Sequence, residues 1–551
     1  MKILVQRMTR FRRSLSFAGL VTAAMFFAMS VAPSLLPRPY VAQGLLSGTA
    51  IAIGYGLGNL AHWLWFWLEL PALAGRARIL VMRVLTLCSG LLFCYFAWRM
   101  TAWQNSIREL MEMPPMETTY LFRMVLIAIL YATVLLVLAR LIRRLNGFVY
   151  RKLTSVLPTK VAFAGSIALV GLLLLLLVND VLAKSLLIAA DAAFSHVDRL
   201  VDEGITRPSD SSVTRSNESL VAWDGIGRHG KTFLVGGPTR EEISVFRSRQ
   251  AKSPLRVYVG LRAAESHKQR ADLALKELKR IGAFQRKLLV VATPTGTGWL
   301  DPNAVDTLEY LHDGDTAIVS MQYSYLPSWI NLLIDPDRAK VAARTLFEKV
   351  YAHWKTLPKH SRPQLYLHGL SLGSYGSEAS ANLLTIIEDP IQGALWSGPP
   401  FPSTGAAAAT DARNLDSPAW LPTFGDGSIL RFTNQHNALD QPNRRWGPIR
   451  CVYIQYASDP MIFFSPSLFW KQPEWLEGER GPDVSPYLDW YPNVTGLQIA
   501  FDLPMATSVP IGYGHNYAPA NYIEGWVAVT QPDNWTDDNT KRLQEKFAKS
   551  R

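Results

Sequence analysis

The sequence predicts an α/β domain, with a mostly parallel sheet covered by helices on both faces, that follows an all-α membrane-spanning region. Three observations support this prediction. The 551-residue chain is 49% hydrophobic and only 18% charged, which is too apolar for a disordered or wholly soluble polar protein. The long apolar runs are confined to the first 204 residues. After residue 218, short β-branched runs alternate with helical patterns, which is typical of a parallel sheet.

The first 204 residues contain five apolar segments, each long enough for the helix of about 20 residues that crosses a bilayer. The formal charge of the chain is +12, and residues 1–204 carry +11 of it. The basic excess therefore belongs to the membrane region and not to a nucleic-acid-binding face. The predicted spans are residues 15–36, 41–68, 79–98, 120–141 and 161–178.

Basic residues set the predicted orientation, because stretches rich in Lys and Arg stay in the cytoplasm. Two such stretches precede the first span and separate the fourth from the fifth. Five spans then give a multi-pass protein of the cell (inner) membrane with a cytoplasmic N-terminus and an extracytoplasmic, periplasmic C-terminal domain. If the first span is a cleaved signal peptide, four spans remain and the C-terminal domain is still outside. The cations are Lys2, Arg7, Arg10, Arg12 and Arg13, and then Arg143, Arg144, Arg151, Lys152 and Lys160.

A polar linker, residues 205–218, separates the membrane region, residues 1–204, from the C-terminal domain, residues 219–551. Residues 270–281 and 337–354 repeat apolar side chains with a period of 3.6 and are expected to be helices. The expected strands are residues 256–261, 287–292, 317–322, 365–368, 393–396, 451–456 and 497–501.

A candidate nucleophile lies in Gly369-Leu370-Ser371-Leu372-Gly373, between a predicted strand and a stretch of small residues that is compatible with a helix. This spacing is typical of a sharp strand-to-helix turn, in which the glycines allow close packing and the Ser hydroxyl is exposed at the carboxyl end of the sheet. The pattern alone is expected by chance roughly 0.2 times in such a chain. Its position after a strand is therefore what supports Ser371.

A serine nucleophile needs a base, and in this arrangement an acid and then a His follow the Ser along the chain. Asp459 comes directly after the strand at 451–456, and His515 is the only His beyond it. We predict that Ser371 attacks a carbonyl carbon, His515 transfers the proton and Asp459 orients the imidazole. Taken singly, each residue also has an ordinary interpretation as part of a turn or loop.

Acyl transfer also needs donors for the oxyanion. The amide of Leu372, directly after Ser371, is the expected first donor. The second is expected in the loop after the strand at 287–292, where Thr295 and Gly296 are the candidates. For either of these two residues, a purely structural role in a tight connection is an equally good interpretation.

Residues 225–232 (GIGRHGKT) match the phosphate-loop pattern in full, which composition predicts only about 0.01 times. A phosphate loop must open a helix whose N-terminus binds the anion, but residues 236–238 (GGP) end any helix within two turns. We interpret the match as a coincidental basic turn and expect no nucleotide. Cys88, Cys94 and Cys451 are not spaced as metal ligands, so neither a metal nor a cofactor is expected.

With these residues in view, the chain resembles a bacterial family of membrane-anchored α/β-hydrolases, in which a multi-span N-terminal region precedes a C-terminal hydrolase domain. The resemblance implies the α/β-hydrolase fold and hydrolase activity, with residues 398–446 as a lid-like insertion. It is carried by residues 256–261 (RVYVGL), 293–299, 322–329 (QYSYLPSW), 369–373, 458–460 and 514–517 (GHNY).

The stretch between Asp459 and His515 is rich in aromatic residues, which fit an apolar acyl pocket or bilayer contact as well as an ordinary core. We expect a serine esterase or lipase-type hydrolase that cleaves a carboxylic ester with a lipid-like acyl part through an acyl-enzyme. Two alternatives stay open: an acyltransferase with the same triad, and a non-catalytic membrane receptor or assembly protein with the same fold. The aromatic residues are Phe463, Phe464, Phe469, Trp470, Trp475, Tyr487, Trp490 and Tyr491.

Overall fold

The computed structural model describes residues 15–72, 74–202, 204–206, 219–380, 383–441 and 444–549. The chain divides into two compact units. The helical unit comprises Met1–Leu186 and Phe464–Pro510, and the sheet unit comprises Leu187–Phe463 and Ile511–Arg551. This division differs from the predicted boundaries, because residues 464–510 fold with the N-terminal helices. Most of the predicted linker, residues 207–218, lies outside the described residues.

Long apolar helices build most of the helical unit, and four helical segments among the described residues are long and apolar enough to cross a membrane. Many of their large apolar side chains are exposed, as is expected of surfaces that face lipid. The segments are α3 (Tyr40–Trp67), α4 (Gly75–Leu110), α5 (Leu121–Leu153) and Thr159–Arg199, the last formed by α6 (Thr159–Leu176), the π-helical turn η1 (Leu177–Ala183) and α7 (Lys184–Arg199).

The prediction of five spans is wrong in its first member. Helix α2 (Phe17–Ser30) has 14 residues, which at 1.5 Å per residue give about 21 Å, short of a hydrocarbon core of about 30 Å. The apolar run continues beyond Ser30, but Pro33 cannot continue a helix. Leu35, within the predicted span, is instead fully buried in a non-helical segment.

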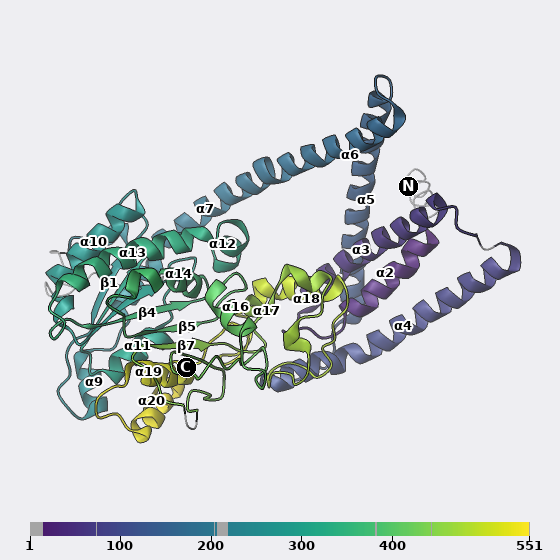
Figure 1. The fold of residues 1–551 in the computed structure, drawn as a ribbon. Helices are drawn as coiled ribbons and strands as arrows, with labels where there is room; N and C mark the ends of the chain where they lie inside the picture. Colours follow the sequence, from purple (N-terminus) through teal and green to yellow (C-terminus); the bar gives the residue numbers. More distant parts are fainter. Residues whose placement is uncertain are drawn as a thin grey trace. The chain divides into compact units, whose positions relative to one another are not determined.

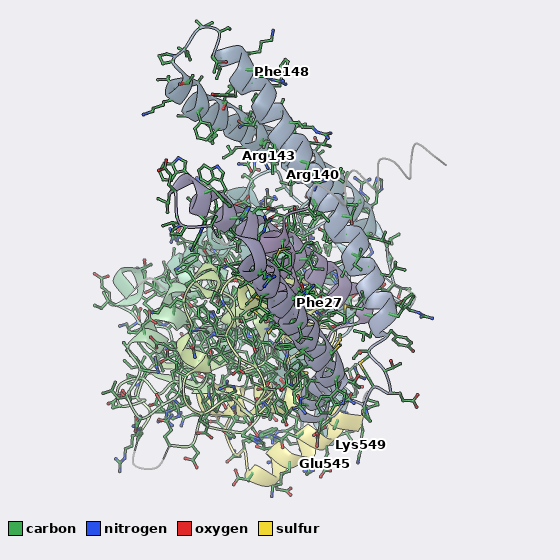
Figure 2. The ribbon with its side chains drawn as sticks, turned by 90° about the vertical axis from the view of Figure 1, so that its right-hand side faces the viewer. Phe27, Arg140, Arg143, Phe148, Glu545 and Lys549 are labelled. Carbon is green, nitrogen blue, oxygen red and sulfur yellow. The ribbon has the colours of Figure 1, made fainter. Side chains whose placement is uncertain are left out.

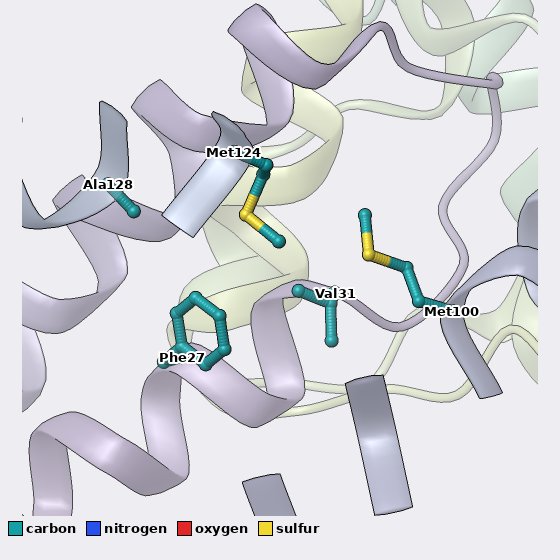
Figure 3. Packing of buried hydrophobic residues seen from close by; sticks show 5 residues of the cluster. All are labelled: Phe27, Val31, Met100, Met124 and Ala128. Carbon is teal, nitrogen blue, oxygen red and sulfur yellow. The ribbon is translucent and has the colours of Figure 1, made fainter. Parts of the chain in front are cut away.

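The helical unit has a core of its own, and α2 packs closely on α3 within it. A Cβ at Gly58 of α3 would lie 2.1 Å from Oγ1 of Thr22 and 2.7 Å from the carbonyl oxygen of Ala18, so only glycine permits this approach. Residues from α2, α4 and α5, together with Val31, meet in one apolar cluster (Figure 3). Its buried members are Phe27, Val31, Met100, Met124 and Ala128.

Residues 464–510 add short helices to this unit, including α18 (Val494–Asp502). The predicted strand at 497–501 is therefore wrong. Leu497 of α18 packs against Leu46 and Ala50 of α3, and Phe501, one turn later, joins the same cluster. An apolar run of five residues is compatible with a strand or a buried helix, and here packing against α3 decides for the helix. The other helices of the segment are the 3₁₀ turns η4 (Pro466–Phe469), η5 (Glu474–Leu476) and η6 (Leu503–Met505).

A seven-stranded parallel sheet, with strand order β1-β3-β2-β4-β5-β7-β6, forms the centre of the sheet unit. The predicted α/β class, with a mostly parallel sheet between helices, is confirmed (Figure 1). The strands are β1 (Leu255–Val259), β2 (Leu288–Thr293), β3 (Thr316–Met321), β4 (Gln364–Leu370), β5 (Gly393–Ser397), β6 (Leu430–Thr433) and β7 (Arg450–Ile454).

Helices cover both faces of this sheet (Figure 1). Helices α10 (His267–Arg280), α13 (Asp337–Thr356) and α14 (Leu372–Ser380) pack in a row on one face, and α11 (Pro302–Leu311) packs with α19 (Pro519–Thr530) on the other. The remaining elements are η2 (Trp223–Gly225), α8 (Arg228–Val235), α9 (Arg240–Arg247), η3 (Ala283–Gln285), α12 (Ser328–Ile334), α15 (Leu383–Ile386), α16 (Thr404–Asp411), α17 (Pro460–Phe463) and α20 (Asp537–Lys549).

The expected lid-like insertion, residues 398–446, is in part a component of the sheet. It contributes helix α16 and the edge strand β6, which pairs in parallel with β7. The sequence prediction missed this strand. Only the rest of the insertion can act as a lid, which stays a prediction.

Candidate active site

Ser371 occupies the turn between β4 and α14 and has a φ of +59°, in the left-handed region that side chains other than glycine rarely adopt. The glycines beside it make the turn possible. A Cβ at Gly369 would lie 2.3 Å from the backbone of Gly373, and a Cβ at Gly373 would lie 2.2 Å from the carbonyl oxygen of Thr293. Ser371 is 2% exposed, and its amide donates to the Ser397 carbonyl at 3.0 Å, which ties the turn to the end of β5. Such strain is typical of functional turns.

Asp459 and His515 form a buried pair. Asp459 follows β7, and its Oδ2 lies 2.6 Å from Nδ1 of His515. Because an ionised carboxylate only accepts hydrogen bonds, Nδ1 carries the hydrogen and Nε2 is left as the basic nitrogen. The carboxylate is itself held by the Tyr517 hydroxyl, which donates to Oδ2 at 2.7 Å, and by the Met461 amide, which donates to Oδ1 at 2.9 Å.

The Ser371 turn and the imidazole of His515 contact two successive residues at the end of β5. Ser371 is bonded to Ser397, and the next residue, Gly398, lies so close to the imidazole that a Cβ on it would be 2.5 Å from Cε1 of His515. Oγ of Ser371 and Nε2 of His515 are both buried, and neither has a hydrogen-bond partner among the residues that the structure describes. The arrangement provides a hydroxyl and a base that remain available to a substrate.

The predicted oxyanion donors differ in their availability. Leu372 contributes the first amide of α14, and first-turn amides have no acceptor within their own helix. The loop after β2 lies against the same helix through the contact of Thr293 with Gly373. However, the amide of Thr295 donates to the Trp299 carbonyl at 2.9 Å, and the amide of Gly296 donates to Oγ of Ser328 at 3.0 Å. These two amides hold the loop in shape, so the expectation that they face an oxyanion is not met.

Two residues that support Asp459 and His515 were not predicted from the sequence. One is Tyr517, which lies two residues after His515; its position in the GHNY motif could have indicated a role in the site. Burial and the neighbouring Asp459 raise the pKa of Tyr517 well above its ordinary value, so the hydroxyl stays protonated and donates a hydrogen bond to Asp459. Ser458 accepts a hydrogen bond from the amide of Gly514 at 2.8 Å and so fixes the loop that carries His515.

The phosphate-loop match, residues 225–232, follows no strand in the described part of the chain, and its helix α8 has only eight residues. The carboxylate of Asp198 lies against Gly227, where a Cβ would be 2.2 Å from Oδ1. The ammonium group of Lys231 lies 5.5 Å from the centre of the Trp223 ring. An acid at this turn disfavours a phosphate; that the motif binds no nucleotide stays a prediction.

Comparison with known families found two matches. A model described as an alpha/beta-hydrolase family matches residues 255–543, which carry the whole sheet and all of the candidate site. A second, described as the N-terminus of an alpha/beta-hydrolase family, matches residues 31–238, which include the four candidate spans. No curated protein matches the chain.

Proposed function

Because the chain belongs to this alpha/beta-hydrolase family, as its motifs had led us to expect, we propose that it is a membrane-anchored serine hydrolase that cleaves a carboxylic ester. Ser371 is the nucleophile, His515 the base and Asp459 its partner. The observation that carries the proposal is the buried 2.6 Å contact of Asp459 with Nδ1 of His515. This contact uses Nδ1, and among the described residues neither Nε2 of His515 nor Oγ of Ser371 has a hydrogen-bond partner.

The proposed reaction has two halves. Oγ of Ser371 attacks the ester carbonyl carbon while its proton passes to Nε2 of His515. The negative charge that develops on the carbonyl oxygen is stabilised by the amide of Leu372. The C–O bond to the alcohol breaks, and the alcohol leaves with the proton from Nε2. A water then attacks the acyl-enzyme, giving one proton to Nε2, and the carboxylic acid leaves as Ser371 recovers its proton.

Asp459 keeps the imidazole in the tautomer that this reaction needs and stabilises the imidazolium formed in each half. Its own position depends on the hydrogen bonds from Tyr517 and Met461. Loss of the carboxylate charge in Asp459→Asn is expected to lower kcat by about 10³- to 10⁴-fold. Tyr517→Phe removes one support only, and we expect a smaller loss.

We propose that the ester has an apolar, lipid-like acyl part. The support is the course of the chain: residues 464–510, which connect Asp459 to His515, belong to the unit that contains the membrane-spanning segments. The segment also carries exposed aromatic surface, such as Trp470, which is 69% exposed. We expect a substrate that partitions into the bilayer, because the segment between Asp459 and His515 folds with the membrane-spanning helices.

We further propose that the sheet unit lies outside the cytoplasm. The turn between α5 and α6 is flanked by basic residues, and Figure 2 shows Arg140, Arg143 and Phe148 along the final part of α5. The positive-inside rule puts this turn in the cytoplasm, and a single crossing, by α6, then leads outwards. With four spans rather than five, this turn still directs the sheet unit outwards, but α3 then begins on the same side as the sheet unit, so the predicted cytoplasmic N-terminus does not follow from four spans. A cysteine introduced at Ser155 in a cysteine-free variant should resist an impermeant maleimide in right-side-out vesicles, whereas one at Glu545 should react.

Fluorophosphonate labelling tests the nucleophile. The full chain in detergent should be labelled, and Ser371→Ala should not. Ser374→Ala is the matched control, because Ser374 is a buried serine three residues later, in α14, whose hydroxyl likewise has no partner among the described residues; this variant should be labelled like the wild type. Equal labelling of Ser371→Ala and wild type, or labelling of neither, contradicts the proposal.

Turnover of nitrophenyl esters tests the substrate class. We expect kcat/KM to rise as the acyl chain lengthens, and both Ser371→Ala and His515→Ala to abolish the reaction. A flat or falling dependence on chain length contradicts the lipid-like substrate but leaves the nucleophile assignment intact. Product analysis with added alcohols separates hydrolysis from transfer to an acceptor other than water.

A further inference from the structure

The sheet unit has an open cavity at the carboxyl ends of β1 and β3, apart from the candidate active site. Its volume is about 560 Å³, within the range of small-molecule sites, roughly 300–1,000 Å³. In the strand order, β3 is two strands and β1 three strands from β4. At about 4.8 Å per strand, the cavity lies some 10–14 Å along the sheet from the strand that precedes Ser371. None of the residues assigned to ester cleavage lines it.

Arg270 of helix α10 is the buried cation of this cavity and is only 4% exposed. Its Nη1 donates to the carbonyl oxygens of Leu261 and Ala264, at 3.2 and 2.8 Å, and its Nη2 lies 2.8 Å from Nδ1 of His267. Among the described residues no carboxylate pairs with it, and its Nε has no hydrogen-bond partner. A buried guanidinium without a counter-charge is unfavourable, so this arrangement points to an anion as the missing partner.

Tyr323 supplies a second unused donor. Its side chain is 1% exposed and lines the same cavity, and within the described part of the chain its hydroxyl has no hydrogen-bond partner. Burial raises the pKa of this hydroxyl well above its ordinary value, so it stays protonated. A buried hydroxyl without an acceptor is unfavourable in the same way. Two residues that line one cavity therefore each carry a buried donor without an acceptor among the described residues, and both donors are compatible with the oxygen atoms of an anion.

The charges around the cavity favour the same ligand. Arg262 and Arg338 complete the lining, paired with Asp198 at 2.7 Å and with Asp335 at 3.3 Å. Burial, and then the two cations Arg270 and Arg338, lower the pKa of His267. Helix α10, with 14 residues, begins at the cavity and presents its positive end there. Glu265, which is exposed, is the opposing charge at the rim.

We propose that this cavity binds a phosphate group, whose oxygens accept hydrogen bonds from Nε of Arg270 and the hydroxyl of Tyr323. Phosphate suits the site because it offers several acceptor oxygens to several guanidinium donors. The group belongs either to free phosphate or to the headgroup of a phospholipid. The proposal uses no residue of the serine hydrolase site and does not depend on ester cleavage.

Calorimetric titration of the full chain in an uncharged detergent tests this site, with inorganic phosphate and short-chain phosphatidylglycerol as the two probes. Tyr323→Phe removes only a hydroxyl without a partner, so the fold should not depend on it, yet phosphate binding should weaken by roughly five- to tenfold. Arg338→Gln should weaken binding as well. Arg344→Gln removes the same charge from an exposed position of the same helix and should leave binding unchanged.

The two probes identify the source of the phosphate. Tighter binding of phosphatidylglycerol, lost in Tyr323→Phe, supports the site and assigns it to a lipid headgroup; tighter binding of inorganic phosphate, lost in the same variant, supports it and assigns it to the free ion. The proposal is overturned if neither probe binds at about 10 mM, or if Tyr323→Phe, Arg338→Gln and Arg344→Gln bind as the wild type does. All measurements can be repeated with Ser371→Ala, so the outcome is independent of hydrolysis.

Discussion

Each of the two units contains a buried arginine, but the two guanidinium groups have different sets of hydrogen-bond acceptors. In the sheet unit, every nitrogen of the Arg256 guanidinium donates a hydrogen bond. Nε and Nη2 donate to the two oxygens of Glu309, at 2.8 and 2.7 Å, Nη2 also donates to Asp306, and Nη1 donates to the Phe233 carbonyl at 2.6 Å. Burial by itself lowers the pKa of Arg256, but the two carboxylates outweigh it and hold the pKa above its ordinary value.

In the helical unit, Arg38 has one carboxylate partner among the described residues. Its Nε lies 3.0 Å from Oδ1 of Asp502 and its Nη1 donates to Gln43 at 2.8 Å, whereas its Nη2 has no hydrogen-bond partner. Here burial dominates: it lowers the pKa of Arg38 and raises the pKa of Asp502 to about 6, although the attraction between the two opposes both shifts. The comparison teaches that a buried arginine is stabilised by a full set of acceptors, and that a single carboxylate does not offset desolvation.

The largest expected effect is that of Arg256→Met. It leaves Glu309 and Asp306 as buried acids without their cation, and we expect the free energy of unfolding of the sheet unit to fall by about 3–5 kcal/mol. Hydrogen exchange of peptides from β1 and α11 in the full chain measures it. The control is Arg249→Met, in a pair with Asp313 whose arginine is 37% exposed, where the loss should stay below about 1 kcal/mol. Equal losses of unfolding free energy in the two variants would mean that the buried ion pairs of Arg256 stabilise the unit no more than the exposed pair of Arg249 does.

Asp502→Asn should remove a pH dependence of the stability of the helical unit. The folded-state pKa of Asp502, about 6, is above its ordinary value of 3.8, so the folded state binds more protons between these values. Stability is therefore greatest below pH 4 and falls as the pH rises to about 6, by about 3 kcal/mol. The variant, which is always neutral, should lack this fall. It also leaves the buried Arg38 without a counter-charge, which is unfavourable, so the expected difference from the wild type lies in the pH dependence and not in the absolute stability.

Hydrogen exchange of α18 at pH 4.5 and 7.5, corrected for the intrinsic rate, measures this effect. Asp489→Asn is a suitable control, because Asp489 lies in the same segment and its side chain is 64% exposed. If Asp502→Asn shows the same change in protection between pH 4.5 and 7.5 as the wild type, burial does not dominate the ionisation of Asp502 and the contrast with Arg256 disappears.

A smaller effect, with the reverse pH dependence, is expected in the sheet unit. Burial lowers the pKa of His312 to about 3 and of His368 to about 4, so the folded state binds fewer protons than the unfolded state below pH 6.5. The sheet unit should lose stability as the pH falls, by about 2 kcal/mol per histidine at pH 5. His368→Gln should remove about half of this slope in the exchange of β4 and β5, whereas substitution of the exposed His360 should leave it unchanged.

Much of the sheet unit could be predicted from sequence, because buried parallel strands are short apolar runs that local patterns reveal. Strand β6 was missed because it has four residues, includes Arg431 and lies at an edge. The run at 497–501 was assigned to a strand because its helical conformation depends on contacts with α3, about 450 residues earlier. The first span was overextended because hydropathy does not register that Pro33 interrupts a helix.

In the candidate site, too, contacts between residues that are distant in the sequence limit what can be predicted. Ser371, Asp459 and His515 could be proposed because chain order and position after strands are properties of the sequence, and the structure places Asp459 and His515 within a hydrogen bond. The donors in the loop after β2 could not be chosen reliably. Whether the amide of Gly296 is free depends on Ser328, which is 32 residues away and becomes a neighbour only in the folded chain.

Residues 464–510 leave the sheet unit five residues after Asp459 and return to it five residues before His515. This course of the chain matters if a protease cleaves between the N-terminal helices and the sheet unit. A protease that released the sheet unit from its N-terminal helices would leave α18 without α3, with Leu497 and Phe501 stripped of their neighbours. We therefore expect that shedding from the membrane ends activity and yields an aggregation-prone fragment rather than a secreted enzyme. The contacts of Leu497 and Phe501 with α3 thus make the folding of the segment between Asp459 and His515 depend on the N-terminal helices.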